Sequence, residues 1–174
     1  MKLSAVIVGM LIIVLSAYVV GSQPTESDAD EAVSGYINLS NLIWQQYEED
    51  MTYSSMILNE FVSGNISSMD ALTTTSSVFL LSSQTTAAAG QIVPPEGFRD
   101  YHHYTLQSQV NLQAYLWNLA KFYETEESQY ALQARDNFNT SISYQEKARD
   151  VLLGFDAEVV EDEAEYMERI ILAT

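Results

Sequence analysis

The chain has 174 residues, and its 24 acidic side chains against 7 basic ones give a formal net charge of −17 at pH 7. It contains no cysteine, which excludes a disulfide framework, a thiolate metal site and a lipid-modified cysteine anchor. The acidic excess argues against direct binding to nucleic acid, because Lys and Arg side chains hold the phosphate backbone.

The N-terminus predicts export. Residues 3–20 are apolar or small without a single charge, and Lys2 precedes them. This run reaches the ~17–25 residues that span a bilayer and exceeds the ~7–15 of a signal-peptide core. Lys2 favours a cytoplasmic N-terminus. Residues 1–22 are therefore predicted to be a signal anchor in the cytoplasmic membrane, single-pass, with the C-terminal domain outside. Because Val20 and Ser22 suit a cleavage site, a cleaved signal peptide and a secreted protein are the alternative.

Residues 23–32 are polar and acidic and contain Pro24, which predicts a short extended linker. Exported proteins can be glycosylated at Asn-x-Ser sequons, and three of these make Asn38, Asn65 and Asn139 candidate glycosylation sites. Asn38 and Asn139 fall one step past predicted core positions, and Asn65 falls in a predicted turn, so all three are expected on the surface.

Residues 33–155 predict an all-α domain, an antiparallel bundle of three to four long helices with coiled-coil-like seams. A first helix ends near Ser63-Gly64-Asn65, and Ser67-x-x-Asp70 is a capping signal for a second. Pro94-Pro95 ends the second helix, and a third runs from about Phe98 to Glu124. No Gly or Pro separates the third helix from a fourth, so the two could equally be one rod.

Seams of apolar and small residues at steps of three and four predict the core. The first helix offers Val33, Ile37, Ser40, Trp44, Tyr47, Met51, Ser54, Leu58 and Phe61. The second offers Met69, Leu72, Ser76, Phe79 or Leu80, Ser83, Thr86 or Ala87, and Gly90. The fourth offers Ala131, Ala134, Phe138, Ser141, Gln145, Ala148, Leu152 and Phe155. The third has a wider apolar face, which indicates a central place, and its aromatic residues are interpreted as core and core-edge packing.

Residues 156–174 alternate acids with apolar residues and predict an acidic amphipathic C-terminal helix. Their last apolar patch is too short for a second membrane span.

Few residues suggest chemistry. Asp100 and His103 have the i, i+3 spacing of two ligands on one helix face and are the candidate metal ligands, but a metal site needs three or four convergent groups. Motifs for serine nucleophiles and phosphate-binding loops are absent from the sequence. The sequence therefore predicts no enzymatic activity and no cofactor.

The resulting hypothesis is an exported, membrane-anchored helical bundle with a non-enzymatic structural or interaction role at the cell surface. Its expected partners are the membrane, through residues 3–20, and a protein or a second copy, through the helical seams. The alternative is an extracytoplasmic sensing module for a small molecule or metal that acts through a separate membrane partner. A cavity lined by tyrosines and by His102 or His103 would favour that alternative.

Overall fold

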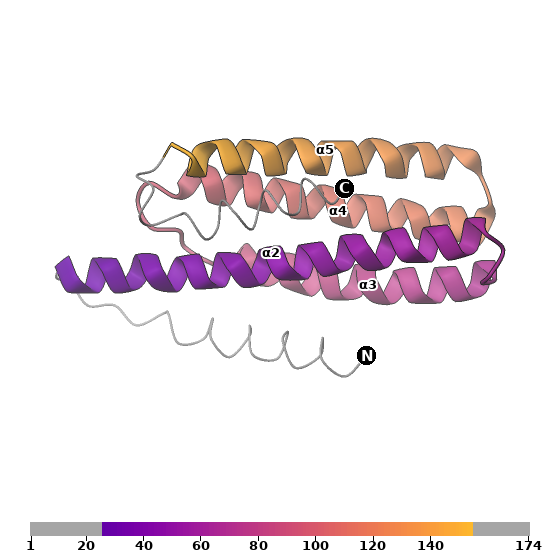
Figure 1. Cartoon of the computed structure of the whole chain (residues 1–174), viewed down its shortest axis with the longest axis horizontal. Coiled ribbons are helices and arrows are strands. Elements are labelled where there is room, and N and C mark those ends of the chain that lie inside the picture. Colours follow the sequence, from indigo (N-terminus) through magenta and orange to yellow (C-terminus); the bar gives the residue numbers. More distant parts are fainter. Residues whose placement is uncertain (1–25, 155–174) are drawn as a thin grey trace.

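The computed structural model describes residues 26–154, and this part of the chain is an all-helical bundle. The predicted N-terminal anchor and the predicted C-terminal acidic helix lie outside the described residues. The helices are α2 (Glu26–Val62), α3 (Ser68–Ala89), α4 (Arg99–Thr125) and α5 (Ser128–Leu152). Consecutive helices run in opposite directions (Figure 1). No strand occurs within these residues, and the predicted all-α fold class is confirmed for them.

Local backbone chemistry sets the helix ends. Gly64 follows α2 with φ +74°, a left-handed conformation that glycine adopts without a steric penalty. Ser67 caps α3 in a complete capping box with Asp70, as its spacing predicts. Glu126, at φ 56°, turns the chain between α4 and α5. The third and fourth predicted helices are therefore two antiparallel helices and not one rod.

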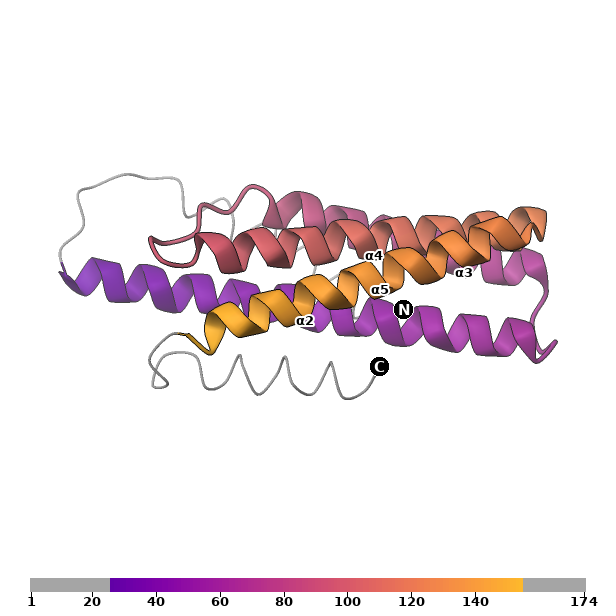
Figure 2. The same ribbon diagram turned by 90° about the horizontal axis from the view of Figure 1, so that it is seen from above.

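The first helix begins earlier than the sequence suggests. α2 starts at Glu26, so residues 26–32, expected to be an extended linker, are helical. The first turns of α2 run past the ends of the other helices (Figures 1 and 2). No helix within residues 26–154 is both long and apolar enough to cross a membrane.

α4 is the central packing partner. It packs most extensively against α5 and next against α3, while α2 packs mainly against α3. The most buried large side chains come from α2, α4 and α5: Trp44, Tyr47, Ile43, Tyr101, Leu112, Leu116, Tyr123 and Leu152. The predicted α5 seam is confirmed at Ala134, Ser141, Gln145, Ala148 and Leu152, which are buried. Its other members Ala131 and Phe138 are half-buried, and Phe155 lies outside the described residues.

The α2 seam is confirmed only in part. Ser40, Trp44, Tyr47, Met51 and Ser54 are buried as expected. A second row is buried beside them, at Tyr36, Leu39, Ile43, Gln46, Asp50 and Ile57. A helix that faces neighbours on two sides buries a wider arc than a two-stranded seam does. This second row includes Asp50, an acidic residue outside the predicted seam.

The interior of the bundle is polar at several levels. Trp44 Nε1 donates to the Tyr101 hydroxyl at 2.7 Å, linking α2 to α4. The Tyr47 hydroxyl lies 2.5 Å from Ser141 Oγ, linking α2 to α5, and Ser141 Oγ donates to the Ser108 carbonyl at 2.8 Å. Such bonds between fixed partners specify which helix faces meet.

Candidate protein-binding surface

The predicted seam of α3 lies on the outside of the bundle. The buried residues of this helix are small or polar: Ala71, Thr75, Val78, Ser82, Thr85, Ala88 and Ala89. Met69, which the sequence places in the core, is 68% exposed, and Leu80, the alternative to Phe79 at one seam position, is 59% exposed. Leu72 and Phe79 are half-buried at the edge of the core. The predicted α3 seam is thus wrong: it lies mostly on the exposed side of the helix, and different residues form the buried side. Small residues pack inward because they let α3 approach its neighbours closely.

This outward side of α3 continues onto α4. Trp117 is 51% exposed and Val110 is 49% exposed. The two residues are seven apart, which places them on the same side of a helix. The Trp117 and Phe79 rings are 5.8 Å apart, so the aromatic residues bridge the two helices. The expectation of core packing holds for the aromatic residues Tyr101, Tyr115 and Tyr123 and is wrong for Trp117.

The same side carries no charge along its length. No Asp, Glu, Lys or Arg occurs between Asp70 and Glu96, which covers all but the first turn of α3. None occurs between Asp100 and Lys121, which covers the middle of α4. The chain has a formal charge of −17, yet these two adjacent helices share long uncharged stretches. We call the exposed, uncharged side of these helices the α3–α4 face: Met69, Leu72, Thr73, Ser76, Phe79, Leu80, Ser83, Gln84, Ala87, Val110 and Trp117.

A groove crosses the α3–α4 face where the two helices meet. Leu72, Ser76 and Phe79 form its α3 side, and Trp117, Ala120, Lys121 and Glu124 form its α4 side. Its volume is about 170 Å³. Small-molecule sites usually enclose ~300–1,000 Å³. The groove is therefore too small for most metabolites and suits one side chain of a partner protein.

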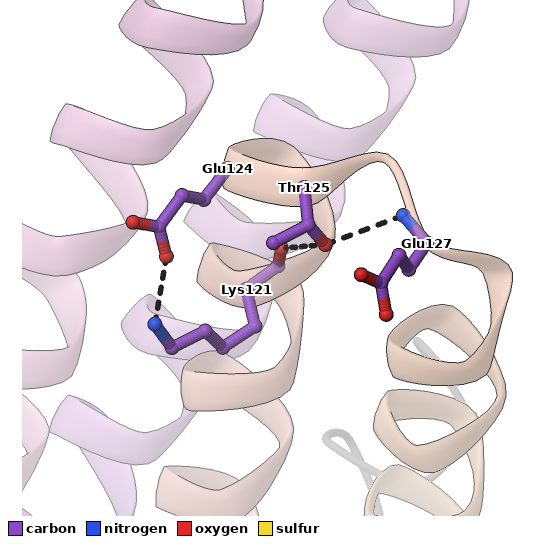
Figure 3. Close-up of polar contacts among 4 residues, drawn as sticks. All are labelled: Lys121, Glu124, Thr125 and Glu127. Carbon is purple, nitrogen blue, oxygen red and sulfur yellow. Dashed lines mark hydrogen bonds and ion pairs between the residues drawn. The ribbon is translucent and has the colours of Figure 1, made fainter.

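One ion pair closes the end of the groove beside the α4–α5 turn. Lys121 Nζ donates to Glu124 Oε2 at 2.7 Å, and this bond raises the pKa of Lys121 (Figure 3). Lys121 Nζ also lies 5.2 Å from the Trp117 ring centre, within range of a cation–π contact. The Thr125 hydroxyl donates to the Lys121 carbonyl and accepts from the Glu127 amide, which fixes the turn. The only charged groups lining the groove thus neutralise each other.

A buried carboxyl group lies behind α3. Asp50 is 2% exposed, and its Oδ1 accepts a 2.9 Å bond from Gln46 Nε2. Its Oδ2 has no hydrogen-bond partner, and neither does the buried Ser82 hydroxyl of α3. Burial raises the pKa of Asp50 to about 7, although the Gln46 bond and the nearby Ser82 hydroxyl oppose the rise. The neutral acid is thus the form that this part of the interior favours below about pH 7.

Other buried polar groups lie nearer α5. Gln145 is fully buried, and neither its amide nitrogen nor its oxygen has a partner. His102 Nδ1 lies 3.3 Å from the Tyr36 hydroxyl, and burial lowers the pKa of this histidine. These groups come from different levels of the bundle, and the groove described above does not reach them.

The candidate metal ligands Asp100 and His103 are both exposed at the start of α4. The structure brings no third acidic or histidine side chain to them, and residues 26–154 contain no group of three or more His, Asp or Glu side chains that could hold a metal ion. The sequon residues Asn38, Asn65 and Asn139 are exposed, as their positions predict. Asn65 Nδ2 donates to Glu60 Oε2 at 2.9 Å. Their glycosylation stays a prediction.

Sequence reasoning missed the α3–α4 face, although one signal pointed to it. Beyond the N-terminal segment, the distribution of charge along the chain has two long gaps, and they fall in consecutive helices. Consecutive antiparallel helices pack side by side, so two uncharged neighbours make one uncharged surface. No protein family, no curated protein and no solved structure matches the chain.

Proposed function

We propose that this protein is a membrane-anchored interaction protein that binds another protein through the α3–α4 face. In this proposal residues 3–20 hold the chain in the cytoplasmic membrane and the bundle stands outside it. The role is structural and needs no catalytic group, no cofactor and no nucleic acid. A secreted form of the same interaction protein is the alternative if residues 1–22 are cleaved.

One observation carries the proposal: the outward edge of the apolar α3 seam is exposed. Residues at heptad-like spacing, Met69, Leu72, Ser76 and Phe79, are suited to packing against another helix. Leu72 and Phe79 touch the core along one edge, and within residues 26–154 no helix covers the outward edge at Met69 and Ser76. The charged side chains that line the groove beside it, Lys121 and Glu124, are paired with each other, so a partner that covers the outward edge desolvates no unpaired ion.

The composition of the face agrees with a protein partner. The centres of protein interfaces are depleted of charged residues and enriched in aromatic residues, and Trp is among the commonest hot-spot residues. Trp117 lines the groove on this face, and that groove has the volume of a side chain. Leu80 and Val110 supply further exposed apolar area on either side.

Site-specific photo-crosslinking in cells of the native source tests the proposal. Because the chain has no cysteine, Leu80→Cys and Leu132→Cys each give a single site for a benzophenone maleimide. Leu80 is 59% exposed on α3, and Leu132 is 52% exposed on α5, which makes the two positions matched. We expect a crosslinked product of defined mass from position 80 alone. No product from position 80, or the same product from both, contradicts a binding role for the face.

The anchor is tested separately on the same material. Retention of residues 1–22, read from the denatured mass, with resistance to carbonate extraction, is the result expected of an anchored protein. A mature chain that begins near residue 23 and fractionates with soluble proteins would contradict the anchor and leave the secreted form.

The sensing alternative ranks second. This alternative calls for a cavity among the tyrosines and His102. The groove described above lies elsewhere, between α3 and α4. The observation that favours it is the unpaired side-chain amide of Gln145, which a buried polar ligand would pair.

A further inference from the structure

We infer that the partner of the α3–α4 face is the same face of a second copy of this chain. This inference rests on the proposed function and specifies which protein binds the α3–α4 face. It follows from three properties of the face: its neutrality, its shape and its size.

Neutrality is the first property. Two copies with a formal charge of −17 each repel one another, and the repulsion is strongest where acidic surfaces meet. The exposed positions of α2 carry Glu31 and Glu60, and those of α5 carry acids and bases together: Arg135, Asp136, Glu146, Lys147 and Asp150. The α3–α4 face carries no unpaired charge, because Lys121 and Glu124 beside its groove form an ion pair. At physiological ionic strength the Debye length is about 8 Å, so charges on the far side of the bundle are largely screened from it. It is thus the surface on which two such chains can approach.

Shape is the second property. A two-fold interface must be self-complementary, because the same patch supplies both sides. The α3–α4 face carries a projection and a recess next to each other. Leu80 lies at the centre of the exposed side of α3, and the groove begins one position away, at Phe79. A two-fold axis that lies in the contact plane and runs along α3, between Leu80 and the groove, places Leu80 of each copy over the groove of the other.

Size is the third property. α3 has 22 residues and is about 33 Å long at ~1.5 Å per residue. Two helices side by side are about 20 Å wide, which gives a face on the order of 600–700 Å² before side-chain relief is counted. Specific interfaces of standard size bury about 600–1,000 Å² on each partner. The face is therefore at the small end of what a homodimer needs, and a homodimer would cover almost all of it.

The full chain, purified in detergent, tests this inference by native mass and by disulfide crosslinking. Leu80→Glu places a charge at the centre of the interface, and Ser76→Phe fills the groove without charge. Leu132→Glu on α5 is the matched control. All variants keep residues 1–22, so any association through that segment is common to them. We expect the unsubstituted chain and Leu132→Glu to be dimers, and both α3 variants to dissociate about tenfold or more readily.

Crosslinking gives the orientation of the contact. Ser76→Cys, near the middle of α3, is expected to form an intermolecular disulfide, which requires the two Cα atoms to be within ~7 Å. Ser143→Cys, exposed on α5, is expected not to. Circular dichroism of each variant confirms that the bundle is intact, and Ser76→Phe provides a second route if Leu80→Glu fails to fold.

Two results overturn the inference. One is a monomeric unsubstituted chain at all concentrations tested. The other is a dimer that Leu80→Glu and Ser76→Phe leave intact. If position 80 nevertheless crosslinks to a different protein in cells, the proposed binding function stands and only the second copy is wrong. If position 80 crosslinks to nothing, both are wrong.

Discussion

The helices α3 and α5 lie on two sides of α4 and differ mainly in what they show to solvent. Both turn small or polar residues inward, such as Ala71 and Ser82 on α3 and Ser141 and Ala148 on α5. Outward, α5 carries Arg135, Asp136, Glu146, Lys147 and Asp150, whereas α3 beyond its first turn carries no charge. Since similar interiors pack against the same helix, the bundle does not require an uncharged exterior on α3. That exterior points to a contact outside the described fold.

The two sides also receive different polar groups from α2. Toward α5, α2 presents the Tyr47 hydroxyl, which is paired with Ser141. Toward α3 it presents the Asp50 carboxyl, which is only partly paired. Burial raises the pKa of both groups, to about 12 for Tyr47 and about 7 for Asp50. Tyr47 keeps its proton throughout the ordinary pH range, so of these two α2 groups only Asp50 is expected to respond to pH.

The largest expected effect comes from Asp50→Asn. In the unfolded chain the carboxyl has an ordinary pKa of 3.8, and burial raises the pKa to about 7 in the folded chain. Between these values the folded chain holds a proton that the unfolded chain has lost, so stability falls as the pH rises from about 4 to about 7 and stays low above that. Asn cannot ionise and keeps an oxygen for Gln46. We expect Asp50→Asn to be more stable than the unsubstituted chain by up to about 4 kcal/mol near pH 8, with little difference near pH 4.

Urea unfolding at several pH values measures this effect. Glu49→Gln is the control, because Glu49 is the neighbouring acid and its charge adds to the rise in the Asp50 pKa. It is expected to have a smaller effect, since Glu49 is only half-buried. A gain for Asp50→Asn that is the same near pH 4 and near pH 8 would show that ionisation of Asp50 is not its cause.

Overpacking tests whether the two interiors are alike. Ala71 on α3 and Ala148 on α5 are both fully buried. Replacing either by Leu adds three carbon atoms to a filled space, and each change is expected to destabilise the bundle by about 1–3 kcal/mol. Ala87→Leu, on the exposed side of α3, is the control and is expected to change stability by less than about 0.5 kcal/mol. Thermal or urea unfolding measures all three. If Ala148→Leu lowers stability strongly and Ala71→Leu does not, α3 is loosely packed. The interiors beside α3 and α5 would then not be alike.

The helix starts provide the smallest test. Ser67 Oγ accepts a bond from the Asp70 amide at 3.1 Å at the start of α3, while Glu127 at the start of α5 makes no side-chain cap. Ser67→Ala is expected to cost about 1 kcal/mol, and Glu127→Ala close to none. The difference in urea midpoint between the two variants measures the cap. Equal midpoints would show that α3 is held by packing alone.

Much of the fold follows from local sequence signals. Gly64, the Ser67–Asp70 box and Pro94-Pro95 act on the backbone within a few residues, so their effect can be read without knowing the neighbours. The α5 seam is also predictable, because its inward residues and its charged residues fall on opposite sides. Residues such as Asp136 and Lys147 identify the side that faces water.

The α3 seam could not be predicted in the same way. A helix without charges does not identify which of its sides faces water, and the larger apolar residues suggest the wrong one. Asp50 was missed for the opposite reason: an acid is expected at the surface, and only the arrangement of α2 against α3 buries it. Both errors arise from contacts between helices, which sequence spacing alone does not contain.

The length of α2 has a mechanical consequence. Its 37 residues make a rod of about 55 Å, and the α2–α3 and α4–α5 turns both lie at its far end (Figure 1). Ser68 Oγ donates to Glu126 Oε1 at 3.2 Å, joining those two turns. The position of the start of α2 therefore determines the position of both turns, including sequon residue Asn65. In the anchored protein we propose, the length of this helix would separate both turns from the end of the bundle at which the chain enters it.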